Sequence, residues 1–435
     1  MNKESIKLSN ISILISRGIT PKYTTNTDAV SVINQKCIRD GKINFDLCKK
    51  HNLLIKKISS EKFLQKNDIL VNSTGVGTLG RVSQISDEIS KTTCDSHVTI
   101  IRPDKTKIDP NYLGAFLYLN QKKIESLGHG STGQTELGRL DLGKLEIPNL
   151  LDKKQKLIGD FFQHFNDKIK TNEKINSTLE EIAAILFKSW FIDFDPVKNK
   201  SASFSTRLPN EISYLFPHSF EDSELGNIPQ GWKICKIKDL LDFEKIIIKP
   251  YENSEEIFYH YSIPAFDDNQ TPSKEIGFSI KSNKYLIEEN VLLVSKLNPR
   301  IPRIWLPSKV RNSGRSISST EFLVCKPKGN VGIPFIYFLI KSSRITQQMI
   351  KMATGTSSSH QRLRPKDFLS MPIIKPDNKL FDLFTNNVSP IFEKYLSIRE
   401  QNTSLIKCRD NILPKLISGE LRIPDAEKMI EEVGI

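Results

Sequence analysis

Two long stretches of the chain carry apolar residues at the spacing of a helical seam. In the first, from Asp152 to about Phe191, apolar side chains recur every three or four residues, with charged residues between them. In the second, from Phe384 to Leu416, the apolar positions alternate between steps of four and three, which is the spacing of a coiled coil. A helix of roughly 40 residues is about 60 Å long, which is longer than a small domain needs for its own core. We therefore expect each long helix to pack against the other.

The seam of each helix contains one polar residue near its middle, Asn172 in the first and Asn402 in the second. A polar seam residue commonly fixes the register and orientation of a helix pair. Either the two asparagines meet across a pseudo-twofold axis, or each faces solvent on an imperfect stripe. We predict that the interface of the helix pair comprises Phe165, Asn172, Leu179, Ile182, Leu186, Ile391, Tyr395, Ile398, Asn402, Leu405 and Ile412.

Proline interrupts the second seam. Pro390 lies within the helical run and Pro414 lies near its end. A proline inside a helix costs about 3 kcal/mol, because it removes one backbone hydrogen bond and its ring clashes with the preceding turn. We therefore expect the second helix to kink at Pro390 or to restart there, and to end at Pro414.

The chain before the first helix recurs, in the same order, before the second helix. Each repeated segment predicts short β-branched strands separated by turns, and the last one predicts a polar loop, a short helix and a strand closed by proline. The matched segments are KLSNISILISRGITPKY and KIKDLLDFEKIIIKPY, NDILVNSTGVGTLGRVSQI and ENVLLVSKLNPRIPRIWLP, CDSHVTIIRP and SSTEFLVCKP, and GHGSTGQTELGRLDLGKLEIP and ATGTSSSHQRLRPKDFLSMP.

The repeat predicts an α+β fold. We expect a tandem pseudo-twofold repeat of mixed α/β domains, joined by two long helices that form an antiparallel coiled coil. Between the halves, a stretch rich in Pro, Ser, Asn and Gly with broken periodicity predicts an irregular connector. The expected boundaries are 1–150 for the first α/β domain, 151–192 for the first long helix, 193–228 for the connector, 229–375 for the second α/β domain, 376–418 for the second long helix and 419–435 for a C-terminal tail.

Composition narrows the class of protein. Hydrophobic residues make up 38% and charged residues 26%, which is typical of a soluble globular protein, and no apolar run is long enough to span a bilayer. The opening residues MNKESIKLSN lack the apolar core of a signal peptide, so we expect a cytoplasmic protein with no membrane partner. The net charge of +13 favours a polyanion partner. Charge alone is weak evidence, because many lysine-rich proteins never bind nucleic acid.

The sequence lacks the motifs of a catalytic or metal-binding protein. The six cysteines form no C-x-x-C pair, so neither a disulfide framework nor a zinc ribbon is indicated, and Cys94 with His97 lacks a second pair of ligands. There is no phosphate-binding loop, no H-E-x-x-H, no G-x-S-x-G and no N/D-P-P-Y/F tetrapeptide. We therefore expect no active site, no metal and no cofactor on this chain.

One nucleotide-binding pattern does occur, the G-x-G-x-x-G of Gly75 to Gly80, directly after a predicted strand. In a dinucleotide site these glycines must open a helix. Here they are followed by RVSQIS, which is typical of a strand. We therefore interpret the glycines as a hairpin loop that lets the backbone approach a neighbour closely or simply turns.

Polar and basic loops recur at corresponding places in the two halves. The segment from Lys296 to Arg315 carries six basic residues and no acidic one, around Trp305. Loops of Ser, Thr, Gly, Gln and Arg follow in both halves, and these side chains bind phosphate oxygens and base edges. An ordinary solvated loop explains either cluster alone, but recurrence favours DNA contact. The candidate DNA-binding residues are Lys22, Tyr23, Ser73, Thr74, Gly75, Arg81, His129, Ser131, Thr132, Gln134, Arg139, Lys296, Arg300, Arg303, Lys309, Arg311, Arg315, Ser357, Ser358, His360, Gln361 and Arg362.

Four stretches resemble a known family, the specificity subunits of type I restriction-modification systems. LEEIAAILFKSWFIDF, from Leu179 to Phe194, resembles the family's motif at the end of the first long helix. GNIPQGW, from Gly226 to Trp232, resembles the opening of the family's second recognition domain. ILPKLISGEL, from Ile412 to Leu421, resembles its ending, and ILVNSTG, from Ile69 to Gly75, its central strand and loop. The first half starts without an I-P-x-G-W opening, and Pro390 is a second departure from the family pattern.

The resemblance implies a non-catalytic subunit with two target-recognition domains that read the two halves of a split site in double-stranded DNA. The paired helices would act as a spacer that sets the distance between the two domains. They would also dock methyltransferase subunits, of which the repeated architecture implies two. Restriction and translocase subunits would join for cleavage. The methyl donor and ATP would belong to those partners.

Two other functions are alternatives to a DNA-specificity subunit. A self-sufficient DNA enzyme would need catalytic motifs that the sequence lacks. An orphan coiled-coil scaffold or competitor would bind methyltransferase subunits without DNA specificity, and methylation of a split motif in the presence of a partner would distinguish it.

Overall fold

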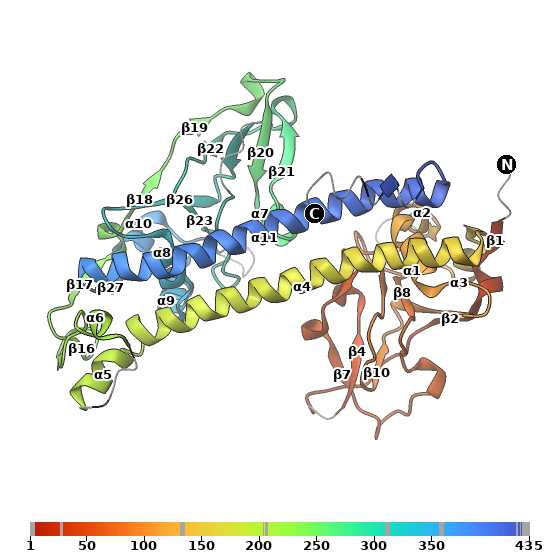
Figure 1. The fold of residues 1–435 in the computed structure, drawn as a ribbon, viewed down its shortest axis with the longest axis horizontal. Coiled ribbons are helices and arrows are strands. Elements are labelled where there is room, and N and C mark those ends of the chain that lie inside the picture. The colour runs from red at the N-terminus through yellow and green to blue at the C-terminus, as the bar shows by residue number, and fades with distance from the viewer. Residues whose placement is uncertain are drawn as a thin grey trace. The chain divides into compact units, whose positions relative to one another are not determined.

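The computed structural model describes residues 5–26, 29–130, 135–202, 204, 208–308, 314–355, 361–422, 425, 426 and 428. It forms two compact units. Unit 1 comprises residues 1–171 and 404–435, and unit 2 comprises residues 172–403. Each unit therefore contains one α/β domain together with segments of both long helices, α4 (Asp152–Phe191) and α11 (Asn378–Ser418) (Figure 1).

The α/β domain of unit 1 is built on an antiparallel sheet. Its strands lie in the order β2 (Ser12–Arg17), β11 (Val98–Pro103), β8 (Ile69–Asn72) and β9 (Val82–Gln84). All four residues of β8 are buried, because its apolar run supplies side chains to both faces of the sheet. Helix α1 (Pro110–Leu119) begins after Asp109, whose Oδ1 accepts the backbone N–H of Tyr112 at 2.8 Å and so caps the first turn.

The remaining elements of the unit 1 domain form a second sheet, short strand pairs and short helices. The second sheet has the order β10 (Thr92–Cys94), β4 (Val30–Ile33), β7 (Lys49–His51) and β3 (Tyr23–Thr24). The strand pairs are β1 (Ser5–Lys7) with β14 (Glu146–Pro148), β5 (Ile38–Arg39) with β6 (Lys42–Ile43), and β12 (Gly128–His129) with β13 (Glu136–Leu137), and the short helices are α2 (Gln121–Ser126) and α3 (Arg139–Gly143).

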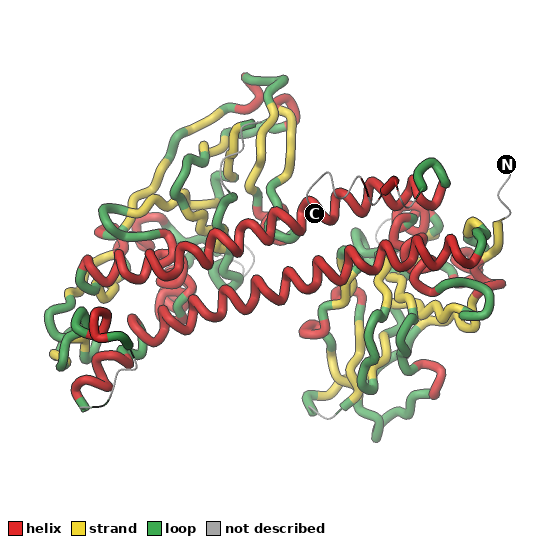
Figure 2. Tube along the Cα trace, viewed as in Figure 1, coloured by secondary structure: helices red, strands yellow, loops and turns green. Residues whose placement is uncertain are grey.

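Unit 2 repeats this architecture. Its central sheet has the order β18 (Leu241–Glu244), β26 (Phe322–Pro327), β23 (Leu292–Ser295) and β24 (Ile304–Trp305). The second sheet has the order β19 (Ile247–Ile248), β22 (Lys284–Leu286), β25 (Arg315–Ser318), β20 (Ile257–Tyr261) and β21 (Ser273–Ile276). The pair β17 (Lys233–Lys236) and β27 (Pro372–Lys375) corresponds to β1 and β14, and the helices are α7 (Ile263–Asp267), α8 (Ile333–Lys341), α9 (Ser343–Met352) and α10 (Pro365–Ser370). The predicted tandem repeat of mixed α/β domains with two long helices is confirmed (Figure 2).

The segment between the two domains contains short elements. These are α5 (Asp195–Ser201), α6 (Asn210–Ser213), β15 (Phe220–Glu221) and β16 (Ile228–Pro229). Phe194, which precedes α5, has a φ of 56°, in the left-handed region, and this residue turns the chain directly after α4. The expected connector, 193–228, is therefore only partly irregular.

The second long helix differs from what its prolines predicted. Helix α11 is continuous through both Pro390 and Pro414, so the expected restart at Pro390 and the expected end at Pro414 are both wrong. The neighbouring Val388 and Phe392 are buried in the core of unit 2. Their packing offsets the loss of the backbone hydrogen bond at Pro390.

The two long helices contact each other within each unit, and the partners run in opposite directions. In unit 2, Asn172 of α4 bonds to Asn402, and Asn176, one turn further on, bonds to the earlier carbonyl of Tyr395. In unit 1, Asn166 of α4 accepts a hydrogen bond from Arg409 of α11. The two seam asparagines therefore meet in the structure, and the alternative that each faces solvent is wrong.

One residue of the predicted seam is on the wrong face. Ile182 is 50% exposed, whereas the neighbouring Ala183 is fully buried, as is Phe187 one turn further on. Phe165, Ile398, Leu405 and Ile412 are buried, and Leu179, Leu186, Ile391 and Tyr395 are half-buried. The prediction placed the largest apolar residues on the packed face of the helix, whereas the small Ala183 and the polar Asn176 lie there.

The core of unit 2 gathers aromatic side chains from three elements. Phe187 and Phe191 of α4 lie against Phe335 of α8, with ring centroids 5.4 and 5.1 Å apart, and Phe191 lies 5.3 Å from Phe384 of α11. Such tilted and edge-on pairs add to the stabilisation from burial alone. The aromatic motif at the end of the first helix thus anchors the second α/β domain to both long helices.

No described helix combines the length and apolarity that a membrane crossing requires.

Candidate nucleic-acid interface

In unit 1, three segments meet where β8 ends. The backbone N–H of Ser73 donates to the carbonyl of His97 at 2.8 Å, and the N–H of Leu137 donates to the carbonyl of Ser73 at 2.9 Å. The glycine loop after β8, the turn before β11 and the segment that follows the polar loop therefore form one edge of the domain. The glycines connect β8 and β9 as a hairpin, as predicted.

Unit 2 has the same framework. The N–H of Lys296 donates to the carbonyl of Glu321, and the N–H of Leu363 donates to the carbonyl of Lys296, both at 2.9 Å. A further bond joins the N–H of Asn298 to the carbonyl of Gln361 at 2.8 Å. In both units, the two loops that the repeat singled out thus lie next to each other.

The unit 1 candidates differ in their access to a ligand. Ser73 is fully buried and its hydroxyl lies 2.6 Å from that of Thr99, so its side chain is not accessible to a ligand in this structure. Arg81 turns back and donates to the carbonyl of Gly77 at 2.8 Å, which stabilises the loop. Thr74 and Gly75 are half-exposed.

The other described candidates of unit 1 lie on its surface. His129 and Arg139 are exposed, and His129 Nε2 lies 3.5 Å from Asp141. Lys22 is exposed, and Tyr23, whose pKa is raised by partial burial, has Lys49 Nζ 4.6 Å from its ring centroid. The candidates Ser131, Thr132 and Gln134 lie outside the described residues.

Several of the basic candidates in unit 2 have carboxylate partners. Arg303 donates from Nε and Nη2 to Asp267, at 2.7 and 2.8 Å, and its side chain is 10% exposed. Arg315 pairs with Glu256 in the same forked way. Both pairs hold the fold together and neutralise the guanidinium charge. The guanidinium of Arg303 is therefore already engaged within the domain, and its contact with DNA stays a prediction.

Two further candidates of unit 2, Lys296 and Arg362, lie close to Glu321. Arg362 donates to both of its carboxylate oxygens, at 3.0 and 3.2 Å, and remains 58% exposed. Burial lowers the pKa of Lys296. Arg300 is exposed and Gln361 is half-buried. The candidates Lys309, Arg311, Ser357, Ser358 and His360 lie outside the described residues.

Comparison with known proteins finds similarity to one family. The model of the type I restriction modification DNA specificity domain matches residues 3–181. The chain is 25% identical to the type I restriction enzyme HindI specificity subunit of Haemophilus influenzae, over 94% of this chain and 98% of the relative. It is 28% identical to the MjaIX specificity subunit of Methanocaldococcus jannaschii, over 71% of this chain and 69% of the relative.

This chain is similar in sequence to the specificity subunits of type I restriction-modification systems. A crystal structure of such an S subunit from M. genitalium has the same fold, with a TM-score of 0.53, 16% identity and 96% of each chain covered. The curated relatives are named as specificity subunits.

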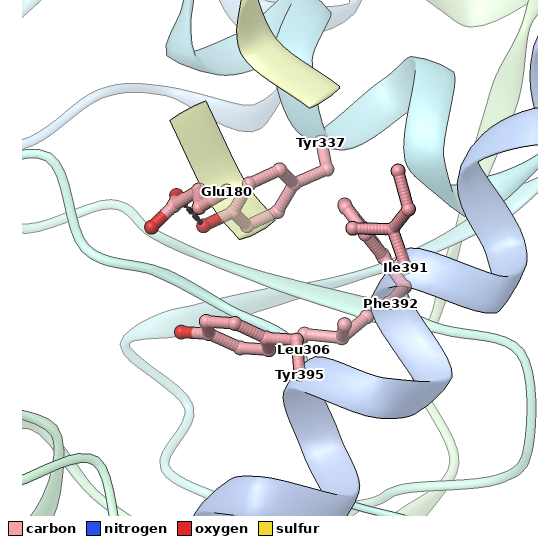
Figure 3. A pocket seen from close by; sticks show the side chains of 6 residues that line it. All are labelled: Glu180, Leu306, Tyr337, Ile391, Phe392 and Tyr395. Carbon is pink, nitrogen blue, oxygen red and sulfur yellow. Dashed lines mark hydrogen bonds between the residues drawn. The ribbon is translucent and has the colours of Figure 1, made fainter. Parts of the chain in front are cut away.

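Each α/β domain is tied to a long helix by a polar contact. In unit 2, Glu180 of α4 accepts hydrogen bonds from the hydroxyl of Tyr337, at 2.6 Å, and from Lys341. Figure 3 shows this contact in a small pocket that Glu180 and Tyr337 share with Leu306, Ile391, Phe392 and Tyr395. Burial raises the pKa of Tyr337 well above its usual range, so the hydroxyl stays protonated and donates.

In unit 1, Arg409 of α11 makes the corresponding connection. Its side chain is 3% exposed, its Nη1 donates to Asn166 of α4 at 2.6 Å, and its guanidinium lies 4.6 Å from the ring centroid of Tyr118 of the α/β domain. Each α/β domain is therefore fixed to the helices of its own unit.

Two polar residues at the unit 1 edge were missed by the sequence analysis. His97 lies 2.8 Å from the hydroxyl of Thr74, and Gln35 Oε1 accepts from the same hydroxyl at 3.1 Å. His97 could have been found, because the matched segments align it with Glu321 in the second half. Gln35 precedes every matched loop and carried no signal. Among the described residues, no group of three or more His, Cys, Asp or Glu side chains could hold a metal.

Proposed function

We propose that this chain is a specificity subunit that reads a split site in double-stranded DNA, one half-site with each α/β domain, and docks methyltransferase and restriction subunits. One observation carries the proposal. The backbone bonds of Ser73 to His97 and Leu137 recur as those of Lys296 to Glu321 and Leu363. The framework is the same in both units while the side chains on it differ, which is what two domains need if they read different half-sites.

The arginines of the loops fall into two groups, those that are exposed without an ion pair and those that are paired with carboxylates. Arg300 and Arg139 are exposed and make no ion pair among the described residues, so they suit contacts to phosphates, which set affinity and its salt dependence. Arg303 and Arg315 are already paired with carboxylates and support the loop instead. The net charge of +13 adds a general attraction to DNA.

An apolar stripe supports the docking of a methyltransferase subunit. Ile175, Ile182 and Ile185 of α4 are 40, 50 and 67% exposed, and their spacing puts them on one side of the helix. The opposite side packs in unit 2. An exposed apolar stripe on a helix is typical of a surface that another helix covers.

The test is to co-express the chain with its candidate methyltransferase subunit and to sequence the methylated DNA. We expect N6-methyladenine in a split motif, and only when both proteins are present. Methylation by this chain alone would contradict a non-catalytic role. No methylation with a partner that is active beside another specificity subunit would favour a scaffold that no longer reads DNA.

A further inference from the structure

Three polar side chains from separate segments meet at the recognition edge of unit 1. His97 comes from the turn before β11, Thr74 from the loop after β8, and Gln35 from a single 3-10 turn, Gln35–Cys37. The hydroxyl of Thr74 lies 2.8 Å from His97 Nδ1 and 3.1 Å from Gln35 Oε1. We call these three residues the His97 cluster.

The fold holds Gln35 in this position from two sides. Its backbone carbonyl accepts a hydrogen bond from Asn72 Nδ2 at 2.9 Å. Gly75, with a φ of +102°, leaves room for its carboxamide, since a Cβ there would lie 2.8 Å from Gln35 Oε1 and 2.4 Å from Thr78 Oγ1. The positive φ and the close approach both require glycine. Gly75 was predicted to contact DNA, and its conformation instead serves Gln35.

The hydrogen-bond directions within the cluster follow from its chemistry. Gln35 Oε1 can only accept, so the single proton of Thr74 points to it. Thr74 must then accept from His97, which fixes the proton of the neutral imidazole on Nδ1. These directions also fix the roles of the two nitrogens that do not contact Thr74. His97 Nε2 is an acceptor and Gln35 Nε2 is a donor, and neither has a partner among the described residues.

The matched edge of unit 2 is built differently. Leu297 stands where unit 1 has Thr74, and Glu321 stands where it has His97. The carboxylate of Glu321 is engaged by Arg362. Among the described residues, the acceptor and donor of the His97 cluster therefore have no counterpart in unit 2, although the backbone beneath them is the same.

We propose that His97 and Gln35, positioned through Thr74, read an adenine in the half-site of the unit 1 domain; this inference rests on the proposed function. Adenine is the one base whose own major-groove edge offers a donor, the N6 amino group, beside an acceptor, N7. His97 Nε2 accepts from N6, and Gln35 Nε2 donates to N7. Guanine offers two acceptors there, and His97 Nε2 in the neutral ring cannot donate to either.

The experiment compares variants in the complex with an active methyltransferase subunit. Binding is measured on DNA in which every base pair of each half-site is changed in turn. His97→Ala and Gln35→Ala should each lower the preference for adenine about tenfold to a hundredfold at one position. The other half-site should be read as before. Glu321→Gln, at the matched position of unit 2, should leave the unit 1 half-site unchanged.

Two conservative variants separate reading from folding. His97→Asn retains an N–H that can reach Thr74 but removes the outer acceptor, so it should lose the adenine preference while the melting temperature stays unchanged. Thr74→Val should lose the preference because the cluster is no longer oriented, and Thr74→Ser, which keeps the hydroxyl, should restore it.

The outcomes distinguish this inference from the function beneath it. If the complex reads a split site, but the His97 and Gln35 variants read it with unchanged base preference, this inference is wrong and the proposed function stands. A loss spread evenly over both half-sites would also overturn this inference, because that is the result of impaired folding or of lost phosphate contacts. A wild-type complex without a split site would overturn the proposed function, and this inference with it.

Discussion

Asn172 of α4 donates a hydrogen bond to Asn402 of α11, with 2.8 Å between Nδ2 and Oδ1, and a second one to Gln401 at the same distance. Asn172 is 2% exposed, so its amide has exchanged water for these partners. A buried polar pair between helices contributes less to stability than to register, because a shifted alignment would bury the amide unpaired.

The first prediction follows from that pair. Asn172→Leu should lower the free energy of unfolding by about 1 to 2 kcal/mol, since it leaves two acceptors without their donor. The double variant Asn172→Leu with Asn402→Leu should be destabilised by less than the sum of the single changes. Urea titration of all three variants measures this coupling. Asn386→Leu, on the exposed face of α11, is the control, and a more stable Asn172→Leu protein would contradict the prediction.

The sequence predicted the repeated framework well because that framework is local. Each strand and each turn of the matched segments is specified by residues next to it, so the corresponding strands and loops of the two units followed from the alignment of the halves. The antiparallel helix pair was predicted from periodicity for the same reason.

The candidate site was predicted less well because it depends on partners that are distant in the chain. Arg303 looked available because no acidic residue lies near it in sequence, yet Asp267 reaches it from α7. Gln35 accepts a hydrogen bond from Thr74, although the two residues are 39 positions apart in the chain. Ile182 was assigned to the packed face because size is visible in a sequence, whereas the choice between Ile182 and Ala183 depends on the neighbouring helix.

Arg409 yields a second prediction, on the stability of unit 1. Arg409→Ala should lower the free energy of unfolding by about 2 to 4 kcal/mol, because it removes a buried guanidinium and leaves Asn166 and the hydroxyl of Tyr118 without their donor. Arg300→Ala, at an exposed position, should change it by less than about 0.5 kcal/mol. Equal unfolding midpoints for the two variants would show that Arg409 is not a structural anchor.

The third prediction concerns two thiols in unit 1. Cys37 Sγ and Cys48 Sγ lie 3.9 Å apart. The hydrogen bond from Cys48 lowers the pKa of Cys37 to about 7, from an ordinary value of 9.0, and raises that of Cys48. Cys37 is therefore about half thiolate at pH 7 and mostly thiolate at higher pH, and the thiolate is the form that reacts.

Hydrogen peroxide should convert this pair to a disulfide, with the peroxide reduced to water. The rate should rise about tenfold from pH 6 to pH 8 and then level off, whereas a thiol with the ordinary pKa would gain roughly a hundredfold over that range and keep rising. Mass spectrometry of alkylated peptides measures the rate. Cys235, whose pKa burial raises to about 11, is the internal control. A rate that still climbs steeply above pH 8 would contradict the lowered pKa of Cys37.

The last prediction tests the apolar stripe of α4 as a docking surface. Ile182→Lys places a charge in the middle of the stripe, where a covering helix would have to desolvate it, so the affinity for the methyltransferase subunit should fall at least about tenfold. Ser177→Lys introduces the same side chain at an exposed position of the same helix, turned away from the stripe, and should leave the affinity unchanged. Neither variant should alter the melting temperature, because neither side chain is packed in the core. Analytical ultracentrifugation of the mixed subunits measures the affinity. If Ile182→Lys bound as tightly as Ser177→Lys, the partner would have to dock on another face of the helix pair.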